Sequence, residues 1–260
     1  MMAKSLPFDI RLAHRIRARE MDLVLREVIQ HRARFRRILE IGAGDGFQSP
    51  HLGAIGKVFP FDVVRHSSDA PPRRFLMASA ERMPYADRSF DLIYSSNVIE
   101  HIEQRQLAFE EMRRVSAEDA LFLHVLPTHI WKLLSVAVYY PLKVVAVGRR
   151  ILQKAHLAEL PAESSAVVPQ RSFMNHFLPR IHGTAPSHTK EFIEFRISSW
   201  ERLFLENGFS CLRTIALLTY SPPEMPLFPP NQWLARAGLP SSVLFVLAKN
   251  HARDMAKAVT

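Results

Sequence analysis

The sequence predicts an α/β protein with a doubly wound, mostly parallel sheet of seven strands. Three observations lead to this prediction. A strand-like apolar run at 38–41 passes directly into a turn with glycine at positions 42, 44 and 46. Short apolar runs then alternate with stretches of helical periodicity up to residue 126. A long segment of different composition follows the fifth run, and two more strand-like runs come after it.

The composition fits one substantial α/β domain with insertions. A chain of 260 residues is small for two domains, and 48% hydrophobic residues favour a packed core over disorder. The single cysteine, Cys211, excludes an internal disulfide or a multi-cysteine metal site and fits a reducing cytoplasm. Charged residues from Lys4 to Arg17 interrupt any apolar core near the start, so we expect no signal peptide.

The net charge is concentrated near the N-terminus. It is 34 − 25 = +9 for the chain, and residues 1 to 37 contain ten Lys or Arg against four acids. Such a segment could attract anionic lipid, nucleic acid or an acidic substrate, or it could be a solvated helix face. Within it, 9–34 has the apolar spacing of one or two amphipathic helices that pack beside the first strand or cap the site.

The predicted organisation has three parts. Residues 1–36 form a basic helical segment, 37–128 and 191–250 form the core, and 129–190 form a helical or loop-rich cap inserted after strand five. The predicted strands after the first are 58–62, 75–78, one within 87–101, 120–126, 211–220 and 242–249. The predicted helices of the core are 47–55, 104–115 and one that begins at an N-cap Ser199 and stops at Gly208.

The glycine turn has the chemistry of a cofactor-binding turn. Glycine can adopt positive φ and lets a ligand approach the main chain, and the helix that follows offers unpaired N–H groups. The third glycine comes one residue too early for the dinucleotide pattern G-x-G-x-x-G, and no phosphate-loop lysine follows. Asp62 ends the second predicted strand, where a carboxylate can accept both hydroxyl hydrogen bonds of a ribose; Asp69 is the alternative.

The run 40–46, EIGAGDG, resembles the first motif of class I S-adenosylmethionine (SAM) dependent methyltransferases. The segment 89–101 is similar to the fourth strand of that family, which ends in a Glu-His pair, and 200–209 loosely resembles its closing portion. The resemblance covers 36–126 well and 196–249 loosely. It implies a Rossmann-like fold, SAM as the cofactor, and an enzyme of the methyltransferase type 11 kind, similar to glycan and small-molecule methyltransferases.

The resemblance also assigns residues to the cofactor. The acid of the second strand is the family's ribose ligand, and the segment at 79–84 borders the adenine, with Ser79 in place of the usual aspartate. The carboxyl end of strand four should line the site because ligands bind there in open parallel sheets. The cofactor residues are therefore expected to be Glu40, Gly42, Ala43, Gly44, Gly46, Asp62, Ser79, Ala80, Glu81, Ser95, Ser96 and Asn97.

Methyl transfer from a sulfonium is a direct displacement that needs a base only if the acceptor must lose a proton early. His101 is the candidate base, and the alternative is that the Glu100–His101 pair only orients the loop. His124 lies within strand five and is expected in the core. No metal is expected, because the histidines of 155–190 match no standard zinc spacing. The candidate acceptor-side residues are Tyr85, His101, Arg171, His182 and His188.

The stretch 130–152 is too polar to span a bilayer. One stripe on a helix would be formed by Lys132, Lys143, Arg150 and Lys154. Such a stripe is typical of an interfacial helix at a lipid surface and predicts a peripheral location at the inner membrane face. The alternative is a lid or dimerisation hairpin kinked at Pro141, buried against the core.

The acceptor class is narrowed by missing motifs. The chain has neither a Pro-Cys nucleophile nor an Asn/Asp-Pro-Pro-aromatic run after strand four, which argues against nucleic-acid bases. We therefore expect a small-molecule, glycan or lipid-linked acceptor, with O-methylation of a saccharide favoured by similarity to glycan-pathway methyltransferases. The alternatives are a nucleic-acid methyltransferase that uses the basic N-terminus and a non-catalytic SAM-binding module. The oligomeric state is left open.

Overall fold

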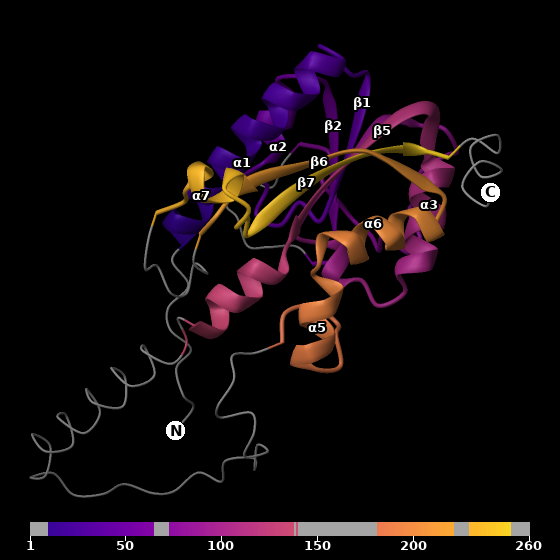
Figure 1. The fold of residues 1–260 in the computed structure, drawn as a ribbon. Helices are drawn as coiled ribbons and strands as arrows, with labels where there is room; N and C mark the ends of the chain where they lie inside the picture. The colour runs from indigo at the N-terminus through magenta and orange to yellow at the C-terminus, as the bar shows by residue number, and fades with distance from the viewer. Residues whose placement is uncertain (1–9, 65–72, 138, 140–180, 221–228, 251–260) are drawn as a thin grey trace, which may run out of the picture.

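The computed structural model describes residues 10–64, 73–137, 139, 181–220 and 229–250 (Figure 1). These residues form a single seven-stranded sheet with the strand order β3-β2-β1-β4-β5-β7-β6. Neighbouring strands from β3 to β5 are parallel, and β7 is antiparallel to both β5 and β6. The predicted doubly wound, mostly parallel sheet is therefore confirmed.

The strands agree closely with the apolar runs of the sequence. They are β1 (Arg37–Ile41), β2 (Lys57–Asp62), β3 (Leu76–Met77), β4 (Phe90–Ser96), β5 (Ser116–Pro127), β6 (Phe209–Leu218) and β7 (Ser242–Lys249). Two strands differ from the prediction by two or more residues at one end or at both. β5 begins four residues earlier than the predicted 120, because Ser116 already pairs with Phe90, and β6 begins and ends two residues earlier.

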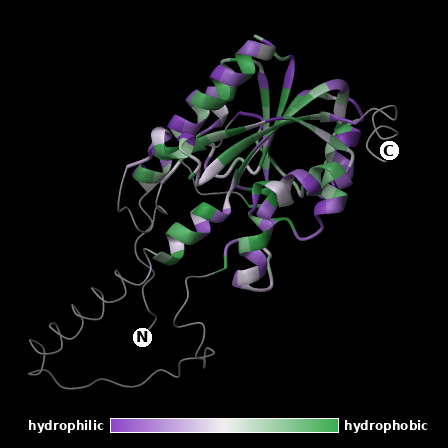
Figure 2. Cartoon of the chain, in the orientation of Figure 1, coloured by the Kyte–Doolittle hydropathy of each residue, from purple (hydrophilic) through white to green (hydrophobic). Residues whose placement is uncertain are grey.

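Helices cover both faces of the sheet. The described helices are α1 (Ile10–His31), α2 (Ser49–Gly53), the 3-10 helix η1 (Ile99–His101), α3 (Arg105–Val115), α5 (His188–Glu194), α6 (Ile197–Glu206) and α7 (Gln232–Arg236), with one more that begins at residue 129. α1 confirms the predicted N-terminal amphipathic helix. In Figure 2 its hydrophobic and hydrophilic residues alternate along its length, as expected for a helix with one buried side.

The core consists of two apolar clusters, one on each face of the sheet. Alternate residues of each strand point to opposite faces, so Ile38 of β1 joins the cluster under α1 and α2, whereas Leu39 joins the cluster under α3 and α6. Trp200 and Phe204 of α6 are 1% and 0% exposed, which confirms that they belong to the core. This three-layer arrangement leaves the carboxyl ends of the parallel strands as the open edge.

Two helix boundaries correct the sequence prediction. The helix after the glycine turn was expected over 47–55 but is only Ser49–Gly53, because the chain begins its helical turn just before Pro50, which has no N–H to donate. α6 was expected to begin at an N-cap Ser199. Arg196 occupies the N-cap instead, and the Ser199 hydroxyl donates to the Ile193 carbonyl at 2.7 Å.

The inserted segment is described only at its two ends. The helix that begins at residue 129 is described to residue 137, and the chain is described again from 181, so most of 130–152, together with Arg171, lies outside the described residues. The two described ends meet in a buried ion pair between Lys132 and Glu191 of α5, with 2.5 Å between Nζ and Oε2. Among the described helices, none has the length and apolar character needed to cross a bilayer.

Candidate functional site

The glycine turn lies at the carboxyl end of β1, and all three of its glycines have positive φ, at +71°, +57° and +81° for Gly42, Gly44 and Gly46. The Gly42 N–H donates to the Phe61 carbonyl of β2 at 2.9 Å. A Cβ at Gly42 would collide with the Val98 side chain, whereas a Cβ at Gly44 would enter open space. Gly42 is therefore required by packing and backbone conformation, and Gly44 by its backbone conformation.

Asp62 lies at the end of β2 and faces the same turn. Its Oδ2 accepts from the Gly44 N–H at 2.9 Å, and its Oδ1 accepts from the Val64 N–H at 3.2 Å. Each carboxylate oxygen has a second lone-pair site, so both can still accept a hydroxyl from a ligand. Main-chain N–H groups of Gly44 and Val64 thus hold the Asp62 carboxylate in place.

A cavity of about 330 Å³ opens in front of Gly42 and Asp62. Its walls come from the ends of β1 and β2, from the segment after β3, and from the segment that follows β4. The lining residues are Ile41, Gly42, Phe61, Asp62, Val63, Ser79, Ala80, Glu81, Val98, His101, Ile102 and Glu103. Six of them, Gly42, Asp62, Ser79, Ala80, Glu81 and His101, are among the residues that the sequence assigns to the site.

The segment 79–82 forms a tight turn beside the cavity. The Ser79 hydroxyl accepts from the Glu81 N–H at 3.1 Å, and the Arg82 N–H donates to the Ser79 carbonyl at 3.2 Å. The Glu81 carboxylate in turn accepts from the Gln104 N–H at 3.1 Å. The Ser79 hydroxyl therefore stabilises the turn, and Glu81 fixes the start of α3.

Glu40 lies beneath the turn and does not line the cavity. It is 1% exposed and accepts from the Ser49 hydroxyl at 2.5 Å, which ties β1 to the start of α2. Burial, together with the nearby charge of Asp45, raises the pKa of Glu40 to about 7, against the lowering by the Ser49 hydrogen bond. The contact that Glu40 makes is therefore with the protein scaffold.

Three residues at the end of β4 were expected to line the site. One of them, Ser95, is buried, and the other two, Ser96 and Asn97, contact Arg17 of α1. Ser95 is 0% exposed and lies 2.7 Å from His124 Nδ1 of β5, which corrects its assignment to the site and confirms that His124 is a core histidine. Ser96 and Asn97 both bind Arg17 of α1. The Ser96 hydroxyl accepts from Arg17 at 3.0 Å, and the Asn97 amide oxygen, turned toward Arg17, accepts at 2.6 Å.

The helix α1 extends over the glycine turn. His14 Nε2 lies 2.7 Å from the Asp45 carboxylate, and its ring stacks on Phe47 with 4.1 Å between centroids. Further along the helix, Arg17 pairs with Glu20 at 2.8 Å. The sequence predicts that this helix flanks or caps the site but singles out neither residue, because Asp45 and Ser96 lie 31 and 79 positions along the chain from His14 and Arg17.

Beside the cavity lies a cluster of Glu100, His101 and His182. The rings of His101 and His182 meet edge to face, with 4.5 Å between centroids, and His182 Nε2 lies 3.5 Å from the Glu100 carboxylate. His101 is exposed and lines the cavity, and burial by its neighbours lowers the pKa of its imidazole while Glu100 opposes part of the shift. The sequence placed His101 and His182 on the same side but missed the partnership with Glu100.

Of the other candidate acceptor residues, Tyr85 lies away from the cavity and His188 lies beside a buried acid. The Tyr85 ring packs edge to face on Phe90 at 4.9 Å and belongs to the border of the core, so it does not line the cavity. His188 faces the buried Glu191, with 3.8 Å between Nδ1 and Oε2. Arg171 lies outside the described residues.

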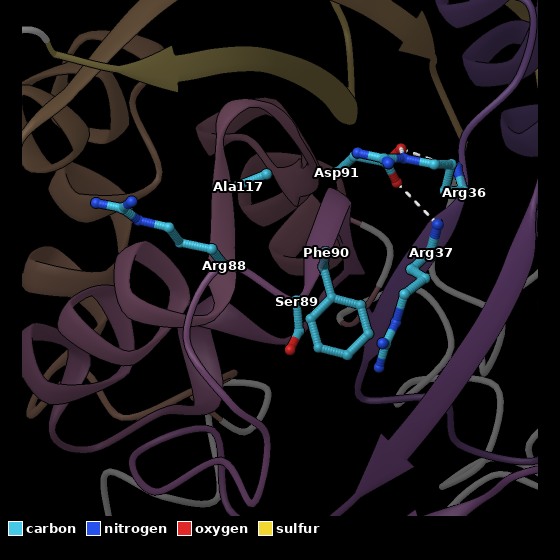
Figure 3. Close-up of a pocket in the computed structure, with 7 residues that line it drawn as sticks. All are labelled: Arg36, Arg37, Arg88, Ser89, Phe90, Asp91 and Ala117. Carbon is cyan, nitrogen blue, oxygen red and sulfur yellow. Dashed lines mark hydrogen bonds and ion pairs between the residues drawn. The ribbon is translucent and has the colours of Figure 1, made fainter.

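A second hollow, of about 300 Å³, lies at the opposite edge of the sheet, at the amino ends of β1 and β4 (Figure 3). Asp91 occupies it and accepts from the N–H groups of Arg36 and Arg37 at 2.8 and 2.9 Å. Figure 3 shows the Arg37 and Arg88 side chains pointing in different directions, so their charges do not converge on one ligand. This hollow is a strand-end packing feature, and the functional edge is the one with the glycine turn.

Part of the chain is similar to known methyltransferases. The model of the family described as "Methyltransferase domain" matches residues 39–123. The rat protein described as "Arginine-hydroxylase NDUFAF5, mitochondrial" is 30% identical over 93 residues, which are 33% of this chain and 27% of that protein. The Geobacter sulfurreducens malonyl-[acyl-carrier protein] O-methyltransferase is 30% identical over 122 residues, 43% of this chain and 46% of that enzyme. The chain thus spans less than half the length of either relative.

The fold is shared with solved methyltransferases. The Burkholderia thailandensis 1,6-didemethyltoxoflavin-N1-methyltransferase, solved with S-adenosylhomocysteine, superposes with a TM-score of 0.51 over 89% of this chain and 79% of that one, at 13% identity. At this identity the likeness concerns the fold, and the family model supplies the sequence relationship. Residues 39–123 thus match a methyltransferase domain, and the sheet has the fold of class I SAM-dependent methyltransferases.

Proposed function

We propose that this chain binds SAM in the cavity beside the glycine turn and transfers its methyl group to an oxygen of a small-molecule, glycan or lipid-linked acceptor. The single observation that carries the proposal is the cavity itself. It brings the Gly42 turn, the Asp62 carboxylate and the segment 79–81 together on one side and opens at His101. These are the parts that a ligand with an adenosine end and a charged methionine end requires.

In this proposal the groups in and beside the cavity bind different parts of SAM. The Asp62 carboxylate accepts the ribose hydroxyls, with both oxygens already oriented by main-chain N–H groups. Ala80 and Ile102 supply apolar surface for the adenine. The open space at Gly44 admits the methionine portion against bare backbone. Because the main chain and not flexible side chains holds these groups, the site is largely formed before a ligand arrives.

SAM supplies the activated methyl group, and the protein supplies orientation. A carbon–oxygen bond forms at the acceptor as the carbon–sulfur bond breaks. The protein must therefore hold the acceptor oxygen in line with the methyl carbon and exclude water, which competes as an acceptor. His101 lies at the mouth of the cavity, where an acceptor would meet the cofactor. Its role as a base stays a prediction.

The choice of an oxygen acceptor rests on two supports. The Geobacter sulfurreducens relative is named as an O-methyltransferase. The sequence also lacks the motifs of cytosine and adenine methyltransferases, which argues against nucleic acid. A saccharide remains the favoured acceptor on the family resemblance alone. The mitochondrial relative is named as a hydroxylase, so the products of the reaction have to be identified directly.

Calorimetric titration with S-adenosylhomocysteine tests the cofactor site. We expect Asp62→Asn to weaken binding at least about tenfold, because hydrogen bonds to a charged acceptor contribute roughly 1.5–3 kcal/mol each. Asp119→Asn, the same change at a carboxylate that is 72% exposed and outside the cavity, is the matched control and should bind as the wild type does. Equal affinities in the three proteins would refute the assignment of Asp62.

Mass spectrometry of extracts incubated with the protein and isotopically methyl-labelled SAM identifies the acceptor. Label in a hydroxylated small molecule, glycan or lipid-linked saccharide supports the proposal. Label in RNA or DNA would refute the acceptor class. Binding of S-adenosylhomocysteine without any labelled product across such extracts would favour a non-catalytic SAM-binding module.

A further inference from the structure

The cluster at the mouth of the cavity has the composition of a metal site. Glu100 and His101 belong to η1, directly after β4, and His182 belongs to the chain that returns from the insertion. One ligand atom from each of the three side chains can be chosen so that all three lie within 4.8 Å of one another. Two imidazoles and a carboxylate suit a divalent transition-metal ion and leave further coordination positions free.

The carboxylate of Glu100 is the observation that points to a cation. It is 0% exposed, and neither of its oxygens has a hydrogen-bond partner among the described residues. A buried charge without such partners is strongly unfavourable unless a cation compensates it. His182 Nε2 lies 3.5 Å from one oxygen without forming a hydrogen bond.

The nearby guanidinium does not provide this compensation. Arg105 donates from Nη2 to the Glu100 backbone carbonyl at 3.2 Å, and from Nη1 to the Glu194 carboxylate at 3.3 Å. Its charge is therefore directed to the main chain and to a different acid. The Glu100 side chain points instead toward the two imidazoles, where a metal ion would find three ligands of suitable type.

The surrounding structure fixes the position of His182. The Thr184 N–H donates to the Glu100 carbonyl at 3.0 Å, and Gly183, at φ +83°, leaves no room for a Cβ against that same carbonyl. The His182 N–H donates to the Glu191 carboxylate at 3.0 Å. Contacts of this kind orient ligands around metal ions. They bring His182 to Glu100 across 82 positions of the chain.

We propose that Glu100, His101 and His182 bind one divalent transition-metal ion at the boundary between the cavity and the inserted segment. The buried carboxylate closes one side of the site, and the exposed His101 leaves the other side open to the cavity. The absence of a zinc spacing among the histidines of 155–190 predicted no metal. That spacing did not reveal this cluster, because two of its three ligands, Glu100 and His101, lie in η1, outside 155–190.

The consequence for the reaction rests on the proposed function. An acceptor hydroxyl bound to the metal would ionise more readily, with its proton leaving to solvent. The resulting oxygen would form its bond to the methyl carbon as the carbon–sulfur bond breaks. In this arrangement His101 is a metal ligand and is not the base.

Titration of the chelator-treated, tag-free protein with Co²⁺ alone tests the site. We expect one equivalent to bind and to produce the visible absorption bands of cobalt held by nitrogen and oxygen ligands. Zn²⁺ should displace it. Glu100→Gln and His182→Ala should each weaken binding at least about tenfold, since even outer-shell changes at metal sites cost 10–100-fold. Circular dichroism checks that both variants fold.

The matched control is His129→Ala, which removes another partly buried histidine near the insertion. Its ring packs edge to face on Phe192 at 5.5 Å and takes no part in the cluster. This variant should bind Co²⁺ as the wild type does. The proposal is overturned if the wild type binds no single equivalent, if folded Glu100→Gln and His182→Ala bind like the wild type, or if His129→Ala loses as much affinity.

The same preparation separates this inference from the proposed function. S-adenosylhomocysteine is titrated into the metal-free protein and into the cobalt-loaded protein. Cofactor binding with no cobalt site would overturn the metal proposal alone. A cobalt site with no cofactor binding would overturn the proposed function alone, because the cobalt ligands are distinct from the Gly42 turn and Asp62.

Discussion

The buried carboxyl group of Glu40, beneath the glycine turn, makes the stability of the protein depend on pH. Glu40 sits under the glycines with its oxygen bound to the Ser49 hydroxyl, and burial raises its pKa to about 7 from the ordinary 4.5. The folded protein therefore holds a proton at this residue over a pH range in which the unfolded chain has released it. Residues of this kind make stability depend on pH.

We expect the free energy of unfolding to fall as the pH rises from about 4.5 to about 7, by up to about 3 kcal/mol from this group. The sign follows because the folded state binds the extra proton in this window. Glu40→Gln keeps the size and removes the titration, so its urea-unfolding curves at pH 5 and pH 8 should differ less than those of the wild type. Identical pH dependence in the two proteins would show that Glu40 does not cause it.

The helix α1 connects the N-terminal segment to the glycine turn. Its apolar side packs on the sheet, and two of its polar residues reach the candidate site: His14 binds Asp45 of the glycine turn, and Arg17 binds Ser96 at the end of β4. The helix therefore combines a structural face with contacts to the turn.

Removing one of these contacts should change local motion more than stability. The pair of His14 and Asp45 is 35% and 40% exposed, so His14→Ala should cost less than about 1 kcal/mol of unfolding free energy. The same change removes the ring that stacks on Phe47. Amide hydrogen exchange of residues 44–48 should then become faster, measured by mass spectrometry, while exchange in β1 stays the same. Unchanged exchange in the turn would show that α1 does not restrain it.

Across the whole molecule, the ion pair of Lys132 and Glu191 joins the two ends of the insertion. Both side chains are almost fully buried, at 4% and 0% exposed, and Glu191 also accepts the His182 N–H. Breaking such a pair leaves an uncompensated buried charge, which typically costs 3–5 kcal/mol. The pair therefore holds the two described ends of the insertion together next to His182.

We expect Lys132→Met to lower the free energy of unfolding by about 3 kcal/mol and to lower the affinity for Co²⁺, because His182 loses its support. Adding Glu191→Gln removes the stranded charge and keeps an acceptor for the His182 N–H, so the double variant should recover most of the loss. Urea unfolding of the three proteins measures this. A double variant no more stable than Lys132→Met would contradict the explanation.

The sequence predicts well what depends on neighbouring residues. The glycine turn, the acid at the end of β2 and the order of strands follow from local patterns, and the structure agrees with them. Ser95 could not be placed in this way. Its hydroxyl is bound to His124 on the adjacent strand, and that contact depends on which strands pair and in which register. Glu100 and His182, or Arg17 and Asn97, likewise meet only through the tertiary fold.

The position of β7 between β5 and β6 has a consequence for biosynthesis. β6 pairs with no strand except β7 within the described sheet, so it has no partner until residues 242–249 have left the ribosome. Until then the β5 edge next to the acceptor side is also open. A nascent chain that stops before Ser242 would expose two unpaired strand edges, which favour association with other chains. The β5 and β6 edges can therefore pair, and so be protected from aggregation, only after β7 has been synthesised.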